Sequence, residues 1–429
     1  MIRVLCDCRL SLRGAKILKE LMLLILVYVA GQTVLAEGGL KLPCGPDGPS
    51  RFGAYYENLS FSLEWDASWR IGPKADVVVR FDTGNQRLVF WHGTNYIPFW
   101  VINENIWYSD GAVVREEAGP YQDRICRYSF VSVVENSDAR VVIRWRYAPV
   151  DKHGKLINTN PMTNWNDWVD EFYTIYPDTT CVRSIRLHST NWDQKFWCQQ
   201  SIIVSHPELT SVKAEVTEME TTSDKGHIKI VELPGINPFH AVSANGEITN
   251  SLISEAWADW PVSGAAQKPE CRFLSSFIWE PYEEDRTSKS WLMLVGLSDG
   301  IEDDVKSLVQ SWLSAPKLDV SGKDFLFLDY DAGEKAYQIT CEKSGKPSPL
   351  NLIIHGSSIS PIVNPAFVVK GWGRNEVIVK INDKPATNGM DFRYGFRKTT
   401  TVSNLILWFQ LKSEKPVSIE VQPVSGQKE

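Results

Sequence analysis

The sequence predicts an all-β protein: a large antiparallel, supersandwich-like β-sandwich, then one late amphipathic helix and a C-terminal β-sandwich region. From about residue 50, short runs of β-branched and aromatic residues alternate with short clusters of turn-forming residues. Turns this short join antiparallel neighbours, because parallel strands need a crossover of about a dozen residues or more. A single segment with helical periodicity interrupts these runs.

The chain begins with the pattern of a secretory signal peptide over residues 1–36. Basic residues precede an apolar run at 21–30, and the small-residue pattern Val34-Leu35-Ala36 precedes Glu37. The apolar run is too short to cross a hydrocarbon core of about 30 Å as a helix. We therefore expect a secreted, periplasmic or cell-surface protein without a membrane span in the mature chain. An uncleaved signal anchor is the alternative.

Three hairpins are predicted in the first half of the mature chain. Each pairs two runs of strand-forming residues across a cluster of turn formers. They cover residues 76–91, 127–147 and 169–187.

The amphipathic helix is predicted by apolar residues at 301, 305, 308, 309, 312 and 313, which share one face at a period of 3.6. Acidic residues at 302–304 suit the positive end of its dipole, and Pro316 lies just past its end. Further strand-like runs follow as far as residue 421. We expect a main β-sandwich domain at 37–315, which contains the candidate groove described below, and a C-terminal β domain at 316–429.

Composition argues against several functions. The mature chain has ten more acidic than basic residues and no basic run, so nucleic-acid binding is not expected. Metal-ligand spacings and nucleotide-binding motifs are missing from it, so no metal or cofactor is predicted. Its six cysteines fit either disulfides or buried thiols, and the sequence leaves both open.

The second hairpin carries the strongest functional signal. Strand alternation in residues 139–147 puts the apolar side chains on one face and Arg140, Arg144 and Arg146 on the other. If Val134 lies opposite Ala139, Arg127 lies opposite Arg146. Like charges that face each other destabilise a sheet unless an anion compensates them.

Two interpretations of these arginines remain open. In the structural one, Asp170 and Glu171 on the adjacent predicted strand neutralise them. In the functional one, the arginines line a groove for an acidic ligand, since the guanidinium group binds carboxylate and sulfate bidentately.

Polar and aromatic segments at 92–107 and 121–127 flank this hairpin and contribute further candidates. Loops on a rigid β scaffold often carry binding residues. The chain has 17 tryptophans, most of them expected in the core. Because residues 164–168 are too polar to be buried whole, the predicted sugar-binding surface includes Trp107, Trp165 and Trp168, with Arg124 beside it.

Several segments resemble one family. They include residues 90–96 (FWHGTNY), 126–129 (CRYS), 144–147 (RWRY), 170–178 (DEFYTIYPD) and 363–367 (VNPAF). Together they resemble secreted β-sandwich proteins of polysaccharide-degrading bacteria, the ulvan-lyase-like polysaccharide lyases. The resemblance covers most of residues 75–370.

The resemblance implies β-elimination at a uronic acid of an acidic polysaccharide, sulfated or unsulfated, without a metal. In this hypothesis Arg127, Arg144 or Arg146 neutralises the uronate carboxylate, assisted by Asn95. Tyr96 or His92 removes the C5 proton, and Tyr121 protonates the leaving oxygen.

The chain also departs from this family. Relatives carry histidines in the segments that match 119–127, 196–200 and 257–260, and this chain has none there. The alternatives are therefore a non-catalytic carbohydrate-binding protein and a structural surface protein.

Overall fold

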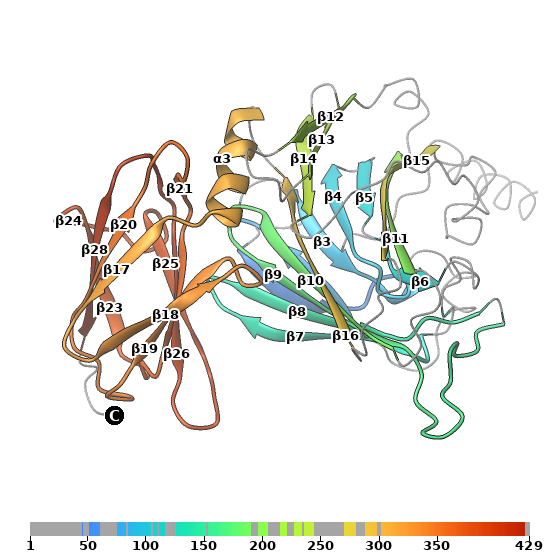
Figure 1. Cartoon of the computed structure of the whole chain (residues 1–429), viewed down its shortest axis with the longest axis horizontal. Coiled ribbons are helices and arrows are strands. Elements are labelled where there is room, and N and C mark those ends of the chain that lie inside the picture. Colours follow the sequence, from blue (N-terminus) through green and yellow to red (C-terminus); the bar gives the residue numbers. More distant parts are fainter. Residues whose placement is uncertain are drawn as a thin grey trace, which may run out of the picture.

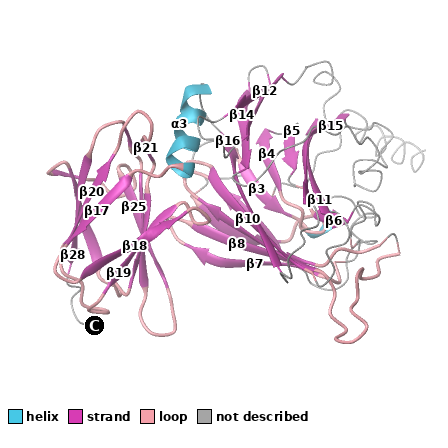
Figure 2. Cartoon of the chain, viewed as in Figure 1, coloured by secondary structure: helices cyan, strands magenta, loops and turns pink. Residues whose placement is uncertain are grey.

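Two β-sandwiches lie side by side, with helix α3 (Glu302–Leu313) above their junction (Figure 1). The computed structural model describes residues 45, 51–60, 75–82, 85–103, 106–109, 111–115, 123, 126–151, 153–189, 196–204, 215–220, 227–233, 236–243, 270–279, 288–297 and 302–424. Strands dominate these residues, and α3 is the one α-helix among them (Figure 2). The prediction of an all-β sandwich fold with one late helix is confirmed.

The N-terminal sandwich consists of two antiparallel sheets. The first runs in the order β1 (Gly53–Glu57), β2 (Asp76–Arg80), β3 (Arg87–Phe90), β4 (Phe99–Asn103), β5 (Ile106–Ser109), β11 (Phe196–Val204) and β15 (Glu270–Trp279), and β6 (Val113–Arg115) also pairs with β11. The second, called the long sheet here, runs in the order β12 (Glu215–Glu220), β13 (His227–Leu233), β14 (Ile236–Ser243), β16 (Ser288–Leu297), β10 (Thr180–His188), β9 (Trp168–Ile175), β8 (Val141–Tyr147) and β7 (Ser129–Asn136). Strand β7 therefore forms one edge of the long sheet.

The C-terminal sandwich also has two main sheets. One has the order β17 (Lys317–Ser321), β20 (Leu350–His355), β28 (Val417–Val424), β23 (Glu376–Ile381) and β24 (Lys384–Pro385). The other has the order β18 (Phe325–Asp331), β19 (Ala336–Cys341), β22 (Ala366–Lys370), β26 (Asn404–Phe409) and β25 (Phe392–Arg397). Strands β19 and β22 pair in parallel, and β21 (Ile362–Val363) pairs with β27 (Lys412–Ser413).

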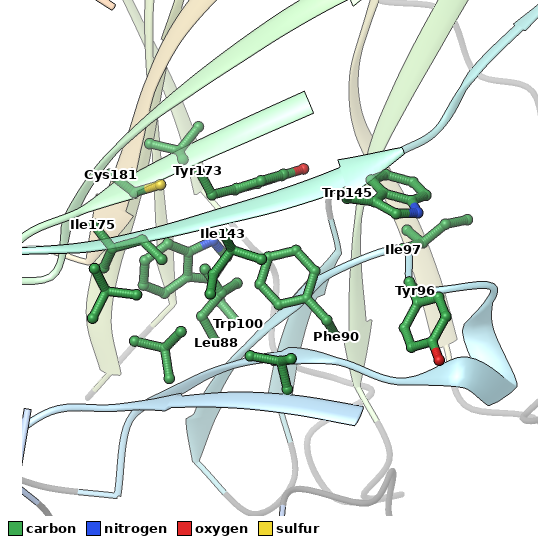
Figure 3. Close-up of a cluster of buried hydrophobic side chains, with 14 of the residues drawn as sticks. Leu88, Phe90, Tyr96, Ile97, Trp100, Ile143, Trp145, Tyr173, Ile175 and Cys181 are labelled. Atoms are coloured by element: carbon green, nitrogen blue, oxygen red, sulfur yellow. The ribbon is translucent and has the colours of Figure 1, made fainter. Parts of the chain in front are cut away.

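Aromatic side chains fill the space between the sheets of the N-terminal sandwich. Phe90 and Trp100 from the first sheet face Trp145 and Tyr173 from the long sheet (Figure 3). Phe90 and Tyr173 meet edge to face, with ring centroids 5.1 Å apart. The alternation predicted for β8 thus holds for its inward side chains, since Trp145 is completely buried.

The predicted register of the second hairpin is wrong. Its turn lies at residues 137–140, where the Ser137 amide donates to the Arg140 carbonyl over 3.0 Å. Strand β7 also contains a bulge between Val133 and Glu135. With this turn and this bulge, Phe130 lies opposite Arg146 in place of Arg127. The turn also buries Arg140, whose guanidinium binds Glu135 and, from the other sandwich, Glu334, each at 2.8 Å.

Helix α3 covers only one end of the outer face of the long sheet. Its apolar stripe, including Val309 and Trp312, packs on Val182 and Leu294 of the sheet and on Val363 of the C-terminal sandwich. The periodicity seen in the sequence therefore marks a buried stripe. At the other end of this face the side chains of Arg144, Arg146 and His188 are between 34% and 41% exposed.

In the part of the chain described by the structure, no helix is long and apolar enough to cross a membrane. Three cysteines, Cys126, Cys181 and Cys341, are buried as thiols. The proposed signal peptide at 1–36 lies outside the described residues.

Candidate functional site

The open end of the long sheet carries a cluster of charged side chains on its outer face. Arg146, Asp170 and Arg186 lie in one cross-strand row, because Asp170 on β9 pairs with Arg146 on β8 and with Arg186 on β10. Arg144 and His188 occupy neighbouring positions on β8 and β10. Strand alternation turns all five side chains outward. We call these five residues the arginine face.

Asp170 is the centre of the arginine face. Its Oδ1 accepts hydrogen bonds from Nε and Nη2 of Arg144, at 2.9 and 2.7 Å. Its Oδ2 lies 3.5 Å from Nη1 of Arg146 and 3.5 Å from Nε2 of His188. One carboxylate thus contacts two arginines and a histidine.

The charges of the arginine face do not balance. Arg144 forms both of its hydrogen bonds with Oδ1 of Asp170, whereas Arg146 lies 3.5 Å from Oδ2. Arg186 forms no ion pair with any described residue and lies 3.5 Å from the hydroxyl of Ser290. With three guanidinium groups and one carboxylate, the face has a net charge of about +2 when His188 is neutral.

His188 adds a titratable group to this face. Burial lowers its pKa below the ordinary value of 6.5, and Arg186 and Arg146 lower it further. Asp170 acts in the opposite direction. Because the net shift is downward, the imidazole is neutral at pH 7 and becomes charged on acidification.

Aromatic side chains surround the charged cluster. The guanidinium of Arg146 lies 4.8 Å from the ring centroid of Trp168, and that of Arg144 lies 5.8 Å from the ring of Phe172. Phe130, opposite Arg146, is about half exposed. Trp165, in the loop that leads into β9, is also about half exposed. Flat apolar surface beside fixed positive charge can pack against a sugar ring and bind its acidic substituents.

The two carboxylates expected to neutralise the arginines behave differently. Asp170 does so, whereas Glu171 points into the sandwich and is completely buried. There it binds Arg183 through two bonds of 2.7 and 3.0 Å and accepts from the hydroxyls of Tyr147 and Tyr173, each at 2.8 Å. Glu171 therefore stabilises the interior and does not compensate the arginine face.

Three predicted residues lie between the sheets instead of on a surface loop. His92 begins the short helix η1 (His92–Thr94), and Asn95 and Tyr96 follow it; all three are less than 5% exposed. Tyr96 lies near the inward-pointing Trp145 (Figure 3). Arg144 and Arg146 point outward from β8, on the side of the long sheet opposite Trp145. The structure therefore does not bring the buried residues 92–96 and these arginines together in one groove.

The interior group has an ordered polar arrangement, which we call the His92 cluster: Asp76, His92, Asn95, Tyr96 and Cys126. Oδ1 of Asp76 accepts from the backbone amide and lies 2.7 Å from Nδ1 of His92. The Tyr96 hydroxyl donates to the Ala75 carbonyl over 3.1 Å, and burial raises the pKa of this phenol far above its ordinary value. The Cys126 thiol donates to the His92 carbonyl over 3.1 Å.

The His92 cluster contains costly features that its own contacts do not offset. Nε2 of His92 and Oδ1 of Asn95 are buried and have no hydrogen-bond partner among the described residues, which costs about 1–3 kcal/mol for each group. Asn95, Tyr96 and Cys126 have left-handed backbones, with φ of 57°, 61° and 47°. Such backbones in residues other than glycine cost about 1–3 kcal/mol each and are concentrated at functional sites.

The remaining predicted residues are placed as follows. Arg127 is exposed just before β7, away from the row that contains Arg146. Tyr121 and Arg124 lie outside the described residues, and Trp107 belongs to β5 but its side chain is not described.

Three functional candidates were missed from the sequence. Arg186 and His188 follow from the same alternation as Arg146, because the predicted strand at 181–187 pairs with the strand that carries Asp170. Asp76 had no local signal, since its contact with His92 joins residues 16 apart in the chain.

Neither a model of a known protein family nor a curated protein matches the chain.

Proposed function

We propose that the protein binds an acidic polysaccharide through the arginine face and acts on it as a polysaccharide lyase. The observation that carries the proposal is the charge imbalance on an open sheet face, with three arginines around the single carboxylate of Asp170. A uronate carboxylate or a sulfate would supply the missing negative charge. Arginine binds both groups bidentately.

The lyase activity needs a cation beside the uronate. β-Elimination begins with loss of the C5 proton, and a positive charge at the carboxylate stabilises the negative charge that develops there. Arg146 and Arg186 suit this role because neither is saturated by Asp170. Trp168, already in contact with Arg146, offers an aromatic surface to the adjoining sugar.

The structural alternative explains only part of the arginine face. It accounts for Arg144, which is bonded twice to Asp170. It leaves Arg186 without a carboxylate partner among the described residues. A face with a purely structural role would gain stability from a second acid near Arg186, because opposite charges on neighbouring strands attract.

The experiment uses a panel of uronic-acid polysaccharides, sulfated and unsulfated, with ulvan among them. Binding is measured by retardation in native gels that contain the glycan, and cleavage by the ultraviolet absorbance of the unsaturated product. Arg146→Ala and Arg186→Ala should each weaken retardation. Arg374→Ala, which removes an exposed arginine of the C-terminal sandwich, is the matched control.

The outcomes separate the candidate functions. Retardation with product formation supports a lyase, and retardation without product supports a non-catalytic binding protein. If the wild-type protein is not retarded by any glycan, or the Arg146 and Arg186 variants bind as tightly as the Arg374 control, the arginine face does not have this function.

A further inference from the structure

A base for the proposed elimination has to lie on the outer face of the long sheet, where Arg146 and Arg186 point. The C5 atom is bonded to the carboxylate carbon, so the group that takes its proton must lie beside the arginines that hold the carboxylate. His92 and Tyr96 do not meet this condition, because both are buried between the sheets. His188 meets it, since it follows Arg186 on the same face of β10 and its side chain is 41% exposed.

Asp170 joins His188 to Arg146. Its Oδ2 lies 3.5 Å from Nε2 of His188 and 3.5 Å from Nη1 of Arg146. The two nitrogens are therefore no further apart than twice this distance, 7.0 Å. A separation of this size leaves room for a carboxylate bound to Arg146 and for the carbon next to it, beside the imidazole.

The contact with Asp170 also determines which imidazole nitrogen of His188 is free. A carboxylate beside Nε2 favours the tautomer with hydrogen on that nitrogen, which leaves the lone pair of Nδ1 as the acceptor. Within the described part of the chain, Nδ1 has no hydrogen-bond partner. A neutral imidazole with a free lone pair on a partly exposed face can take a proton from a ligand.

The charged groups around His188 come from three adjacent strands. Among the described residues, Asp170 on β9, Arg186 on β10 and Arg146 on β8 act on its imidazole. Burial lowers the pKa of His188, the two arginines lower it further, and Asp170 raises it. Because the pKa lies below 6.5, the imidazole is in the proton-accepting form at neutral pH.

Trp168 places an aromatic surface between the cation and the imidazole. It lies directly opposite His188 in the register of β9 and β10, and its ring centroid is 4.8 Å from the guanidinium of Arg146. A sugar that packs on the indole would therefore contact both Arg146 and His188. Groups that project from neighbouring strands of one sheet hold their relative positions better than groups on separate loops.

His188 lies outside every segment that carries the family resemblance. It also lies outside residues 119–127, 196–200 and 257–260, where relatives have histidines. The case for His188 therefore depends on its neighbours in this sheet and on nothing transferred from the family.

We propose that His188 is the catalytic base of the elimination and that Asp170 positions its imidazole. Nδ1 takes the C5 proton of the uronate, and the electron pair left on C5 forms the C4–C5 double bond while the C4–O4 bond breaks. Water protonates the leaving oxygen, and the hydroxide that remains takes the proton from the imidazolium. Arg146 and Arg186 stabilise the negative charge that develops on the carboxylate. This assignment rests on the proposed lyase activity and names the residue that begins it.

The test measures product formation and retardation in the glycan gel in parallel at neutral pH. His188→Ala removes the base and should lower the elimination rate about 10²–10⁴-fold. Retardation should change little, because the imidazole is uncharged at this pH. His188→Gln, which keeps a polar side chain, should be as inactive. His355→Ala is the matched control, since His355 is 40% exposed and contacts a carboxylate, Asp319, on the C-terminal sandwich.

The pH dependence gives a readout that a merely structural role of His188 would not produce. As the pH falls through the pKa of His188, the imidazole takes a proton and elimination should slow, while retardation should strengthen because the face gains positive charge. Since Asp170 raises this pKa, Asp170→Asn should move the loss of rate to lower pH. An unchanged midpoint in Asp170→Asn would contradict the assignment.

The assignment and the proposed function fail in different ways. A His188→Ala protein that forms product at the wild-type rate overturns the assignment and leaves the lyase proposal intact. Loss of product together with loss of retardation also overturns it, because His188 would then be a binding residue. A wild-type protein that forms no product from any glycan refutes both the base and the lyase activity, whereas its retardation still tests the arginine face. If a His188 variant loses its thermal unfolding transition, the pH profiles of the wild type and Asp170→Asn decide.

Discussion

Replacing Asp170 by asparagine distinguishes the functional from the structural interpretation of the arginine face. The change keeps the size of the side chain and removes the only negative charge of the face. It releases Arg144, now bonded at 2.7 Å, and Arg146, now at 3.5 Å. The net charge of the face rises by one unit, so a bound polyanion no longer meets a carboxylate.

The size of the effect follows from simple electrostatics. Two unit charges 4 Å apart interact by about 1 kcal/mol in water and more beneath a partly covered surface. Removing the repulsion between Asp170 and the glycan should therefore tighten binding about fivefold or more. The cost in stability should stay below about 1 kcal/mol, because the side chains of Arg144 and Arg146 are more than 30% exposed and such ion pairs contribute little.

Isothermal titration at low and high salt measures the affinity, and chemical denaturation measures the free energy of unfolding. Asp319→Asn is the matched control, because Asp319 pairs with Lys317 and His355 on the exposed face of the C-terminal sandwich. Unchanged or weaker glycan binding in Asp170→Asn, together with a loss of stability, would refute the functional interpretation and favour the structural one.

Three further predictions concern titration and packing. Because the pKa of His188 is lowered, glycan binding should tighten as the pH falls below 6.5, and His188→Ala should flatten this dependence in the same titrations. Burial lowers the pKa of Lys335 from 10.5 to about 8, so the unfolded chain binds more protons than the folded one between these values. The free energy of unfolding should therefore rise with pH by an amount on the order of 3 kcal/mol relative to Lys335→Met, as measured by denaturation at pH 7.5 and 10.5. Gly395→Ala should lower the Tm, because the new methyl group would lie 2.3 Å from Cβ of Ser137 across the interface of the sandwiches. An unchanged Tm would show that the interface accommodates the methyl group without a loss of stability.

The interface between the sandwiches explains why Lys335 is a sensitive position. Its ammonium donates to the carbonyls of Val363 and Asn364, over 3.1 and 3.0 Å, and lies 5.9 Å from the ring of Tyr176 in the other sandwich. No carboxylate forms an ion pair with it within the described part of the chain, although Asp178 partly offsets the effect of burial on its pKa. A buried ammonium held only by carbonyls is costly to keep charged.

Local periodicity predicted the features that depend on one strand or helix at a time. The alternation that turns Trp145 inward and Arg144 outward is a property of β8 alone, and so was visible in the sequence. The stripe of α3 was visible for the same reason. Register was not predictable in this way, because the turn lies at residues 137–140 and β7 contains a bulge, and together these put Phe130 in the place expected for Arg127.

The sequence did not predict that His92 is buried, because contacts with residues distant in the chain bury it. Residues 92–96 look like a surface loop, since they contain glycine, threonine and asparagine. Asp76 and Ser129 bind this segment from β2 and β7 and hold it between the sheets. Neither contact leaves a periodic signal in the sequence.

The positive charge of the arginine face is informative because the chain as a whole is negatively charged. The chain has seven more acidic than basic residues, so a surface assembled without constraint would be negative on average. The outward positions around Asp170 instead hold three arginines and a histidine. Like charges so close together destabilise the sheet, and an acidic chain has carboxylates available that could remove this cost. A positive face that persists under these conditions is best explained by a negatively charged ligand, and α3, which covers only the apolar end of the sheet, leaves the face open to receive one.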